Sequence, residues 1–209
     1  MPSPLALAAI TLIAIAPRLV AQSPAPSPTA AGTRGRVPPA AVQIAAATAP
    51  APAEQRAGAT VLGYAADGRL TTLRAGTGDL VCLASDPAAD AFHVACYHKS
   101  LEPFMARGRE LRAKGMSAGA VDSARAAEIA ARTLAMPSHP AALYSLTGPA
   151  GSVDPTTGAV SGARPLYVVY IPFATAESTG LSPTPTRGAP WIMFPGTPKA
   201  HIMFTPDMR

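Results

Sequence analysis

The sequence predicts an α+β fold in which an antiparallel sheet, built from an N-terminal meander and C-terminal strands, packs against two central helices. Three observations lead to this prediction. Short β-prone runs separated by turn residues come first, two helical patterns occupy the middle, and apolar runs return towards the C-terminus. The length of 209 residues suggests one domain. We place this domain at residues 54–209, after a signal peptide at 1–21 and a disordered tether at 22–53.

The N-terminus has the pattern of an export signal. An apolar run covers residues 5–16, which suits the core of a signal peptide and is too short to span a bilayer comfortably. No Lys or Arg precedes this run, and cleavage after Ala21 would leave Leu19 where a small residue is preferred. We expect export to the periplasm or the extracellular space, with no stable transmembrane segment in the mature chain.

The next stretch, residues 22–53, is rich in Ala, Pro, Ser and Thr and has few large apolar side chains. Proline disfavours helix at the preceding residue, and there is little apolar surface whose burial would offset the chain entropy. We therefore predict a disordered tether, with one or two helical turns at 42–49. It is interpreted either as a spacer that associates the domain with the cell envelope or as a passive tail.

The net charge of +5 is unevenly distributed. Residues 1–53 contain three arginines and no acidic residue, whereas residues 54–209 hold the other 14 basic residues and all 12 acidic ones. The expected domain is therefore nearly balanced in charge, which does not favour a nucleic-acid partner.

The first four strands are predicted at 61–64, 69–73, 80–84 and 92–97. Asp67-Gly68 supplies the positive φ angles of a tight hairpin turn, and a second glycine-rich turn covers 76–79. We predict that these four strands form an antiparallel meander.

Two helices are predicted to follow. The first covers 101–114, where Ser100 is suited to cap it, apolar residues recur at helical spacing, and Gly115 provides the stop. The second is an alanine-rich helix at 122–136 that ends before Pro137. The remaining strands are expected at 142–146, 166–173, 191–194 and 201–205.

Both cysteines fall in the third and fourth predicted strands. If these strands pair symmetrically about Ala89, Cys82 faces Cys96 and Leu80 faces His98. Directly opposed residues of an antiparallel pair lie within disulfide range, and an exported chain reaches an oxidising compartment. We therefore predict a disulfide between Cys82 and Cys96.

A metal site is the alternative for this region. The pattern Cys-x10-His-x2-Cys-x-His supplies two thiolates and two imidazoles, a ligand set that zinc accepts. However, a regular hairpin places His93 on the face opposite the cysteines. A smaller set made of His98, Glu102 and His201 remains a candidate ligand or metal site, and a small metal- or haem-binding protein centred on His98 and Cys96 is an alternative function.

Ser117 gives a second alternative, because the run from Gly115 to Gly119 matches the G-x-S-x-G nucleophile elbow of hydrolases. Asp154 and His201 follow in the order of such a triad. An elbow requires a buried strand before the serine, whereas an amphipathic helix precedes Ser117. We therefore expect a non-catalytic exported module for binding or envelope structure, with no cofactor.

Overall fold

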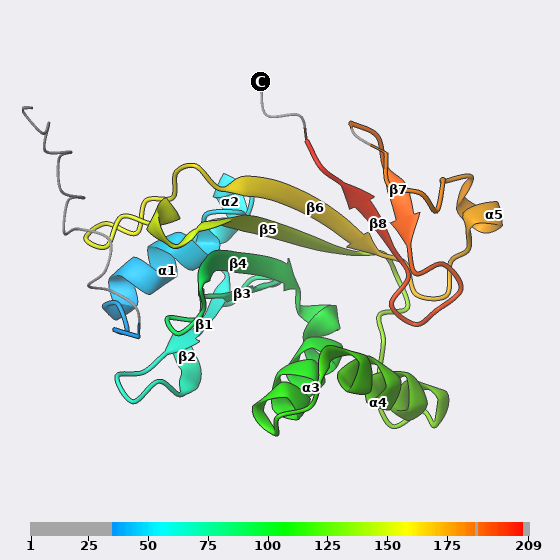
Figure 1. Cartoon of the computed structure of the whole chain (residues 1–209), viewed down its shortest axis with the longest axis horizontal. Coiled ribbons are helices and arrows are strands. Elements are labelled where there is room, and N and C mark those ends of the chain that lie inside the picture. Colours follow the sequence, from blue (N-terminus) through cyan, green and yellow to red (C-terminus); the bar gives the residue numbers. More distant parts are fainter. Residues whose placement is uncertain (1–34, 187, 207–209) are drawn as a thin grey trace, which may run out of the picture.

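The computed structural model describes residues 35–186 and 188–206, and it has an α+β fold built on one mixed sheet of eight strands (Figure 1). The expected signal peptide and residues 22–34 of the expected tether lie outside the described residues. The strands are β1 Thr60–Tyr64, β2 Leu70–Arg74, β3 Leu80–Leu83, β4 Ala91–His98, β5 Ala141–Pro149, β6 Arg164–Tyr170, β7 Trp191–Met193 and β8 His201–Phe204. They are arranged in the order β2-β1-β3-β4-β5-β6-β8-β7.

The helices are α1 Ala40–Thr48, α2 Ala53–Arg56, α3 Glu102–Ala113, α4 Ala118–Ala130 and α5 Ala176–Thr179, with 3-10 turns at Lys99–Leu101 and Ala150–Ser152. Helix α1 lies along the β1, β3 and β4 part of the sheet, and α3 and α4 lie together beyond the end of β4 (Figure 1). Both predicted central helices are present, α3 close to its expected bounds and α4 shifted towards the N-terminus, whereas α1 is a third helix on the opposite face.

The predicted antiparallel meander is wrong at one place, because β3 pairs with β1 in parallel. The chain leaves β2, crosses the start of β1 and adds β3 on its far side. Glycines permit this crossing. A Cβ atom on Gly76 would stand 2.3 Å from the carbonyl oxygen of Gly58 and from the amide nitrogen of Thr60, and Gly78 donates its N–H to Gly58. The glycine-rich segment at 76–79 therefore carries a crossover rather than a hairpin turn.

The prediction of a tether extending to residue 53 is also wrong, since α1 packs on the sheet. Val42, Ala46 and Ala47 are buried, and Ala51 is buried just beyond the helix. Small side chains let the helix approach the strands closely. An alanine-rich segment can therefore pack on the sheet although it has few large apolar side chains.

Gln43 fixes α1 to β1. Its side-chain nitrogen donates to the carbonyl oxygens of Pro38 and Tyr64, and its side-chain oxygen accepts from the Tyr64 N–H at 2.8 Å. The residue is 5% exposed. Gln43 therefore satisfies both backbone polar groups of Tyr64 in the way a neighbouring strand would.

Helix α3 and the turn before it pack on the other face near the end of β4, and α4 packs on α3. Leu101 and Met105 pack with Val81 and Tyr97, and the Phe104 ring meets Tyr170 edge-on at 6.3 Å between centroids. Helix α4 ends at Ala130 rather than at the predicted residue 136. Both Thr133 and Leu134 donate their N–H groups to the carbonyl of Glu128, which closes the helix earlier.

Candidate functional site

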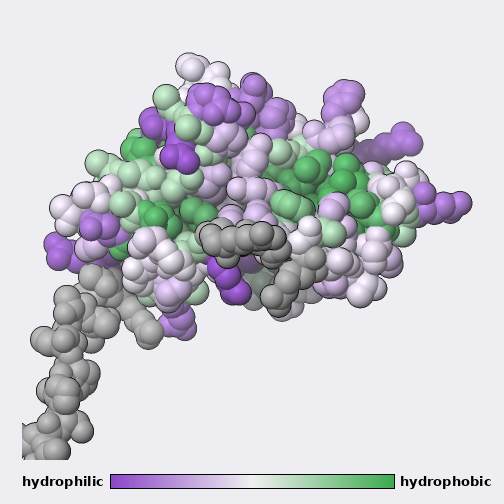
Figure 2. Space-filling view, turned by 90° about the horizontal axis from the view of Figure 1, so that it is seen from above, coloured by the Kyte–Doolittle hydropathy of each residue, from purple (hydrophilic) through white to green (hydrophobic). Residues whose placement is uncertain are grey.

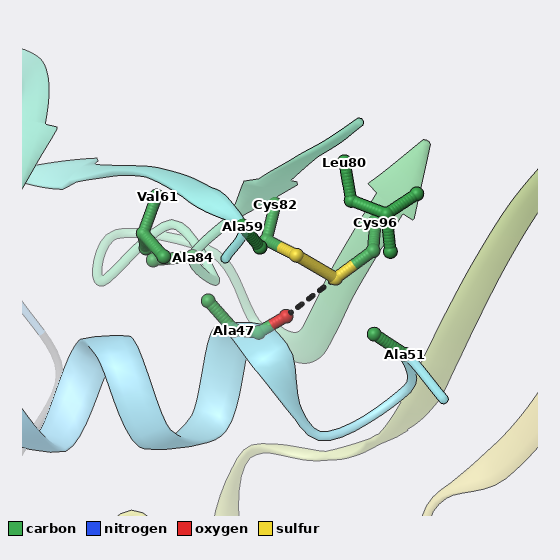
Figure 3. Packing of buried hydrophobic residues seen from close by; sticks show 8 residues of the cluster. All are labelled: Ala47, Ala51, Ala59, Val61, Leu80, Cys82, Ala84 and Cys96. Atoms are coloured by element: carbon green, nitrogen blue, oxygen red, sulfur yellow. Dashed lines mark hydrogen bonds between the residues drawn. A yellow bond between two sulfur atoms is a disulfide. The ribbon is translucent and has the colours of Figure 1, made fainter. Parts of the chain in front are cut away.

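The two cysteines lie opposite each other in the predicted register, with Cys82 paired to Cys96 and Leu80 to His98. Their Sγ atoms are 2.06 Å apart, at disulfide distance. Both residues are fully buried, and Cys96 Sγ lies 3.2 Å from the carbonyl oxygen of Ala47 in α1 (Figure 3). The small side chains of Ala59, Ala84 and Ala51 surround the pair (Figure 3).

The structure does not bring His98, Glu102 and His201 together. His98 lies on the α1 face, in line with Leu80, and its Nδ1 is 2.8 Å from the Ser100 hydroxyl. His201 pairs with Tyr170 on the opposite face. Across residues 35–186 and 188–206, no group of three or more His, Cys, Asp or Glu side chains is arranged to hold a metal ion.

Glu102 belongs to a structural cluster of polar side chains. It accepts a hydrogen bond from the Tyr97 hydroxyl at 2.6 Å and pairs with Arg109 at 2.6 Å, while Arg109 also donates to the Tyr97 oxygen. Burial, followed by the hydrogen bond to Glu102, raises the pKa of Tyr97 well above its ordinary value. Tyr97 therefore stays protonated as the donor that joins β4 to the first turn of α3.

His201 is packed as an aromatic side chain. Its ring centroid lies 5.0 Å from Tyr170 and 5.8 Å from Phe194, and Nδ1 is 2.6 Å from the carbonyl oxygen of Lys199. Burial is the main cause that lowers the pKa of His201; the nearby Lys199 charge acts in the same direction and the hydrogen bond to the Lys199 carbonyl opposes both. The imidazole is therefore neutral at pH 7.

The three residues of the hydrolase hypothesis each have local partners. Ser117 caps α4 by accepting from the Ala120 N–H, and Asp154 accepts from the N–H groups of Thr156 and Thr157. The turn that follows β5, which holds Asp154, and strand β8, which holds His201, lie at opposite ends of the sheet (Figure 1). The described structure therefore forms no Ser-Asp-His triad.

Two clefts lie elsewhere in the structure, on either side of α2. The first has a volume of about 270 Å³ and lies between the segment before α2 and the surface of β5 and β6. Its walls expose polar and apolar surface in about equal parts, and Arg56 is the one charged lining residue in the part of the chain that the structure describes. The lining includes Ala49, Pro50, Pro52, Arg56, Tyr144, Leu146, Pro165 and Tyr167.

The second cleft has a volume of about 530 Å³ and lies on the other side of α2. It has more polar and charged residues in its lining, which includes Glu54, Gln55, Asp79, Leu80, His98, Pro140, Ala142 and Tyr144. Asp79 forms an ion pair with Lys99 at 2.7 Å. Tyr144 lines both clefts, and among the described residues its hydroxyl has no hydrogen-bond partner.

Aromatic side chains continue along the sheet beyond the clefts. Tyr144, Tyr167 and Phe204 occupy paired positions on β5, β6 and β8, with ring centroids 6.0 and 6.5 Å apart. Tyr167 is 41% exposed. Hydrophobic side chains also gather over the end of the sheet formed by β6, β8 and β7 (Figure 2). Sequence reasoning did not single out Tyr144, since its role depends on a segment some ninety residues earlier in the chain.

No protein-family model, curated protein or solved structure matches this chain. Among the helices of the described ranges, none is long and apolar enough to cross a membrane.

Proposed function

We propose that this protein is an exported, non-catalytic binding module and that its ligand site is the pair of clefts that meet at Tyr144. The observation that carries this proposal is the unused polar group at their junction. Tyr144 is half-buried, and its hydroxyl has no hydrogen-bond partner among the described residues. The two clefts that it lines combine apolar side chains with a few charged groups, which is a common composition of a ligand site.

Export is supported by two features that do not depend on each other. The apolar run at residues 5–16 has the length of a signal-peptide core, and the chain has two cysteines, which lie at disulfide distance. Disulfides persist in oxidising compartments. Association with the cell envelope would then depend on residues before α1, because residues 40–53 belong to the folded part.

The rival functions have weaker support. Catalysis by Ser117 requires a base within hydrogen-bond reach, whereas its hydroxyl caps α4. A metal or haem site at His98 and Cys96 requires a free thiolate, whereas Cys96 lies at disulfide distance from Cys82 beneath α1. Ligand binding at the clefts requires neither a catalytic base nor a free thiolate.

The test is a thermal-shift screen of a small-molecule library against the full mature chain, followed by calorimetry on the hits. Tyr144→Ala should remove binding of the hits by deleting the wall shared by both clefts. Phe173→Ala is the matched control, since Phe173 is an aromatic residue that is 55% exposed and lines neither cleft. Hits that bind Tyr144→Ala as tightly as the unchanged protein would refute the proposed site.

A further inference from the structure

Helix α2 separates two clefts of different charge. Glu54 lines the second cleft and Arg56 lines the first. Side chains two positions apart on a helix point in nearly opposite directions, so one short helix directs an anion to one side and a cation to the other. Tyr144 lines both clefts, so a ligand that lies across this ring would be near both charges.

The charged groups have atoms available for a ligand. Arg56 donates from Nε to the Ala51 carbonyl and from Nη2 to the Ala49 carbonyl, both at 2.8 Å, which holds the guanidinium against the cleft wall and leaves Nη1 unused. Glu54 has no ion pair or hydrogen bond from its side chain within the described ranges. Because Lys99 neutralises Asp79, Glu54 is the uncompensated charge of the second cleft.

Apolar side chains form part of the walls of both clefts. In the first cleft the ligand would lie against Pro50, Leu146 and Tyr167, and in the second against Leu80 and Ala142. A neutral saccharide would leave both charges unpaired, a simple carboxylic acid would use only the Arg56 side, and an amine only the Glu54 side. A ligand with both charges and an apolar middle matches the whole surface.

We propose that the clefts bind a short peptide with free termini, whose carboxylate lies at Arg56, whose ammonium group lies at Glu54 and whose apolar side chain packs on Tyr144. This inference rests on the proposed function, since it names the ligand class of the same site. A peptide of about two to four residues, at roughly 3.5 Å per residue, has the length to reach across one aromatic ring and a helix of one turn.

The experiment is calorimetric titration of the full mature chain, at low salt, with the tripeptide Ala-Phe-Ala and with its N-acetylated, C-amidated and doubly blocked forms. Each blocked terminus should weaken binding roughly fivefold, the range of a partly exposed ion pair. Glu54→Gln should weaken binding of the free peptide but not of the acetylated form. Arg56→Gln should weaken binding of the free peptide but not of the amidated form.

Matched controls separate the site from general charge effects. Glu177→Gln and Arg164→Gln change exposed charges that line neither cleft and should leave all four affinities unchanged. Arg56→Lys keeps the positive charge but loses the hydrogen bonds of the guanidinium to the two carbonyls. If Arg56→Lys still binds the free peptide more tightly than the amidated one, the effect of Arg56→Gln is due to the lost charge and not to a change in the structure around α2.

Equal affinity for the free and doubly blocked peptides, or no binding of the free peptide, would overturn the peptide assignment. The proposed function would survive these outcomes if other library compounds still bind in a manner that depends on Tyr144. The proposed function itself fails if no library compound binds in a manner that depends on Tyr144.

Discussion

Individual residues in this protein are held by a few specific partners, and the cysteine pair is the clearest example. Cys82 and Cys96 are opposed in the sheet, fully buried and at disulfide distance. Thiol counting on denatured, unreduced protein from the native source should find no free thiol. Because the bridge would close a loop of about 15 residues, replacing both cysteines with Ala should cost on the order of 3 kcal/mol of unfolding free energy. Two titratable thiols would contradict the bridge.

A second residue-scale prediction concerns Gln43. Gln43→Ala leaves the N–H and carbonyl of Tyr64 without this partner in a partly buried position. An unsatisfied backbone group costs about 1–3 kcal/mol when it is buried, so chemical denaturation should show a loss of unfolding free energy of about 1 kcal/mol at this partly buried position. Gln55→Ala, which changes an exposed glutamine, should have little effect; comparable losses in the two variants would rule out this role of Gln43.

The buried imidazole of His201 makes stability depend on pH. Because burial lowers its pKa in the folded protein, the unfolded chain takes up this proton first as the pH falls below about 6.5. The unfolding free energy should therefore fall with decreasing pH, by at most about 1.4 kcal/mol per pH unit for this group, and should not depend on it above pH 7. Denaturation curves of His201→Gln should have a shallower slope, while His139→Gln, in an exposed turn, should match the unchanged protein.

At the scale of elements, the packing of α1 on the sheet is the main departure from what the sequence indicated. A chain that begins at residue 54 should melt on the order of 10 °C below a chain that begins at residue 35, since it lacks the helix that buries Val42, Ala46 and Ala47 against the sheet. Differential scanning calorimetry of the two chains tests this. Equal melting temperatures would mean that α1 contributes nothing to the core.

The elements that local pattern determines were predictable, and those that depend on distant contacts were not. The symmetric connector around Ala89 was enough to predict the register of β3 and β4. The parallel pairing of β1 and β3 depends on contacts of Gly76 and Gly78 with the backbone near Gly58, which no local pattern records. Helical turns were expected at 42–49, but the packing of α1 on the sheet was missed because its buried side chains are mostly alanines, so it lacks the apolar stripe that usually identifies a packed helix.

The candidate site, too, depends on distant contacts that the local sequence pattern does not show. His98, Glu102 and His201 were chosen because their side chains carry chemistry, but the strand alternation and the sheet order send them to different surroundings. The clefts, in contrast, arise where the residues around α2 lie over β5. The sequence gives no indication of such a site, since its polar residues are of common types and form no motif. Only the fold brings them together.

For the whole molecule, the central question is whether it is exported and its signal peptide is cleaved. If the N-terminal apolar run acts as a cleaved signal, protein purified from the native envelope or medium should begin near Gln22. N-terminal sequencing checks this directly. An intact Met1 on protein recovered from the cytoplasm would contradict export.

The position of α1 over the two sulfurs also has a kinetic consequence. A thiolate that reduces a disulfide has to approach one sulfur along the bond, and here the sulfurs are inaccessible while α1 is in place. Reduction then has to wait for α1 to detach, so its rate under native conditions would report how often this helix opens. The rate of disulfide reduction would thus measure the local unfolding of α1, although this helix contains neither cysteine.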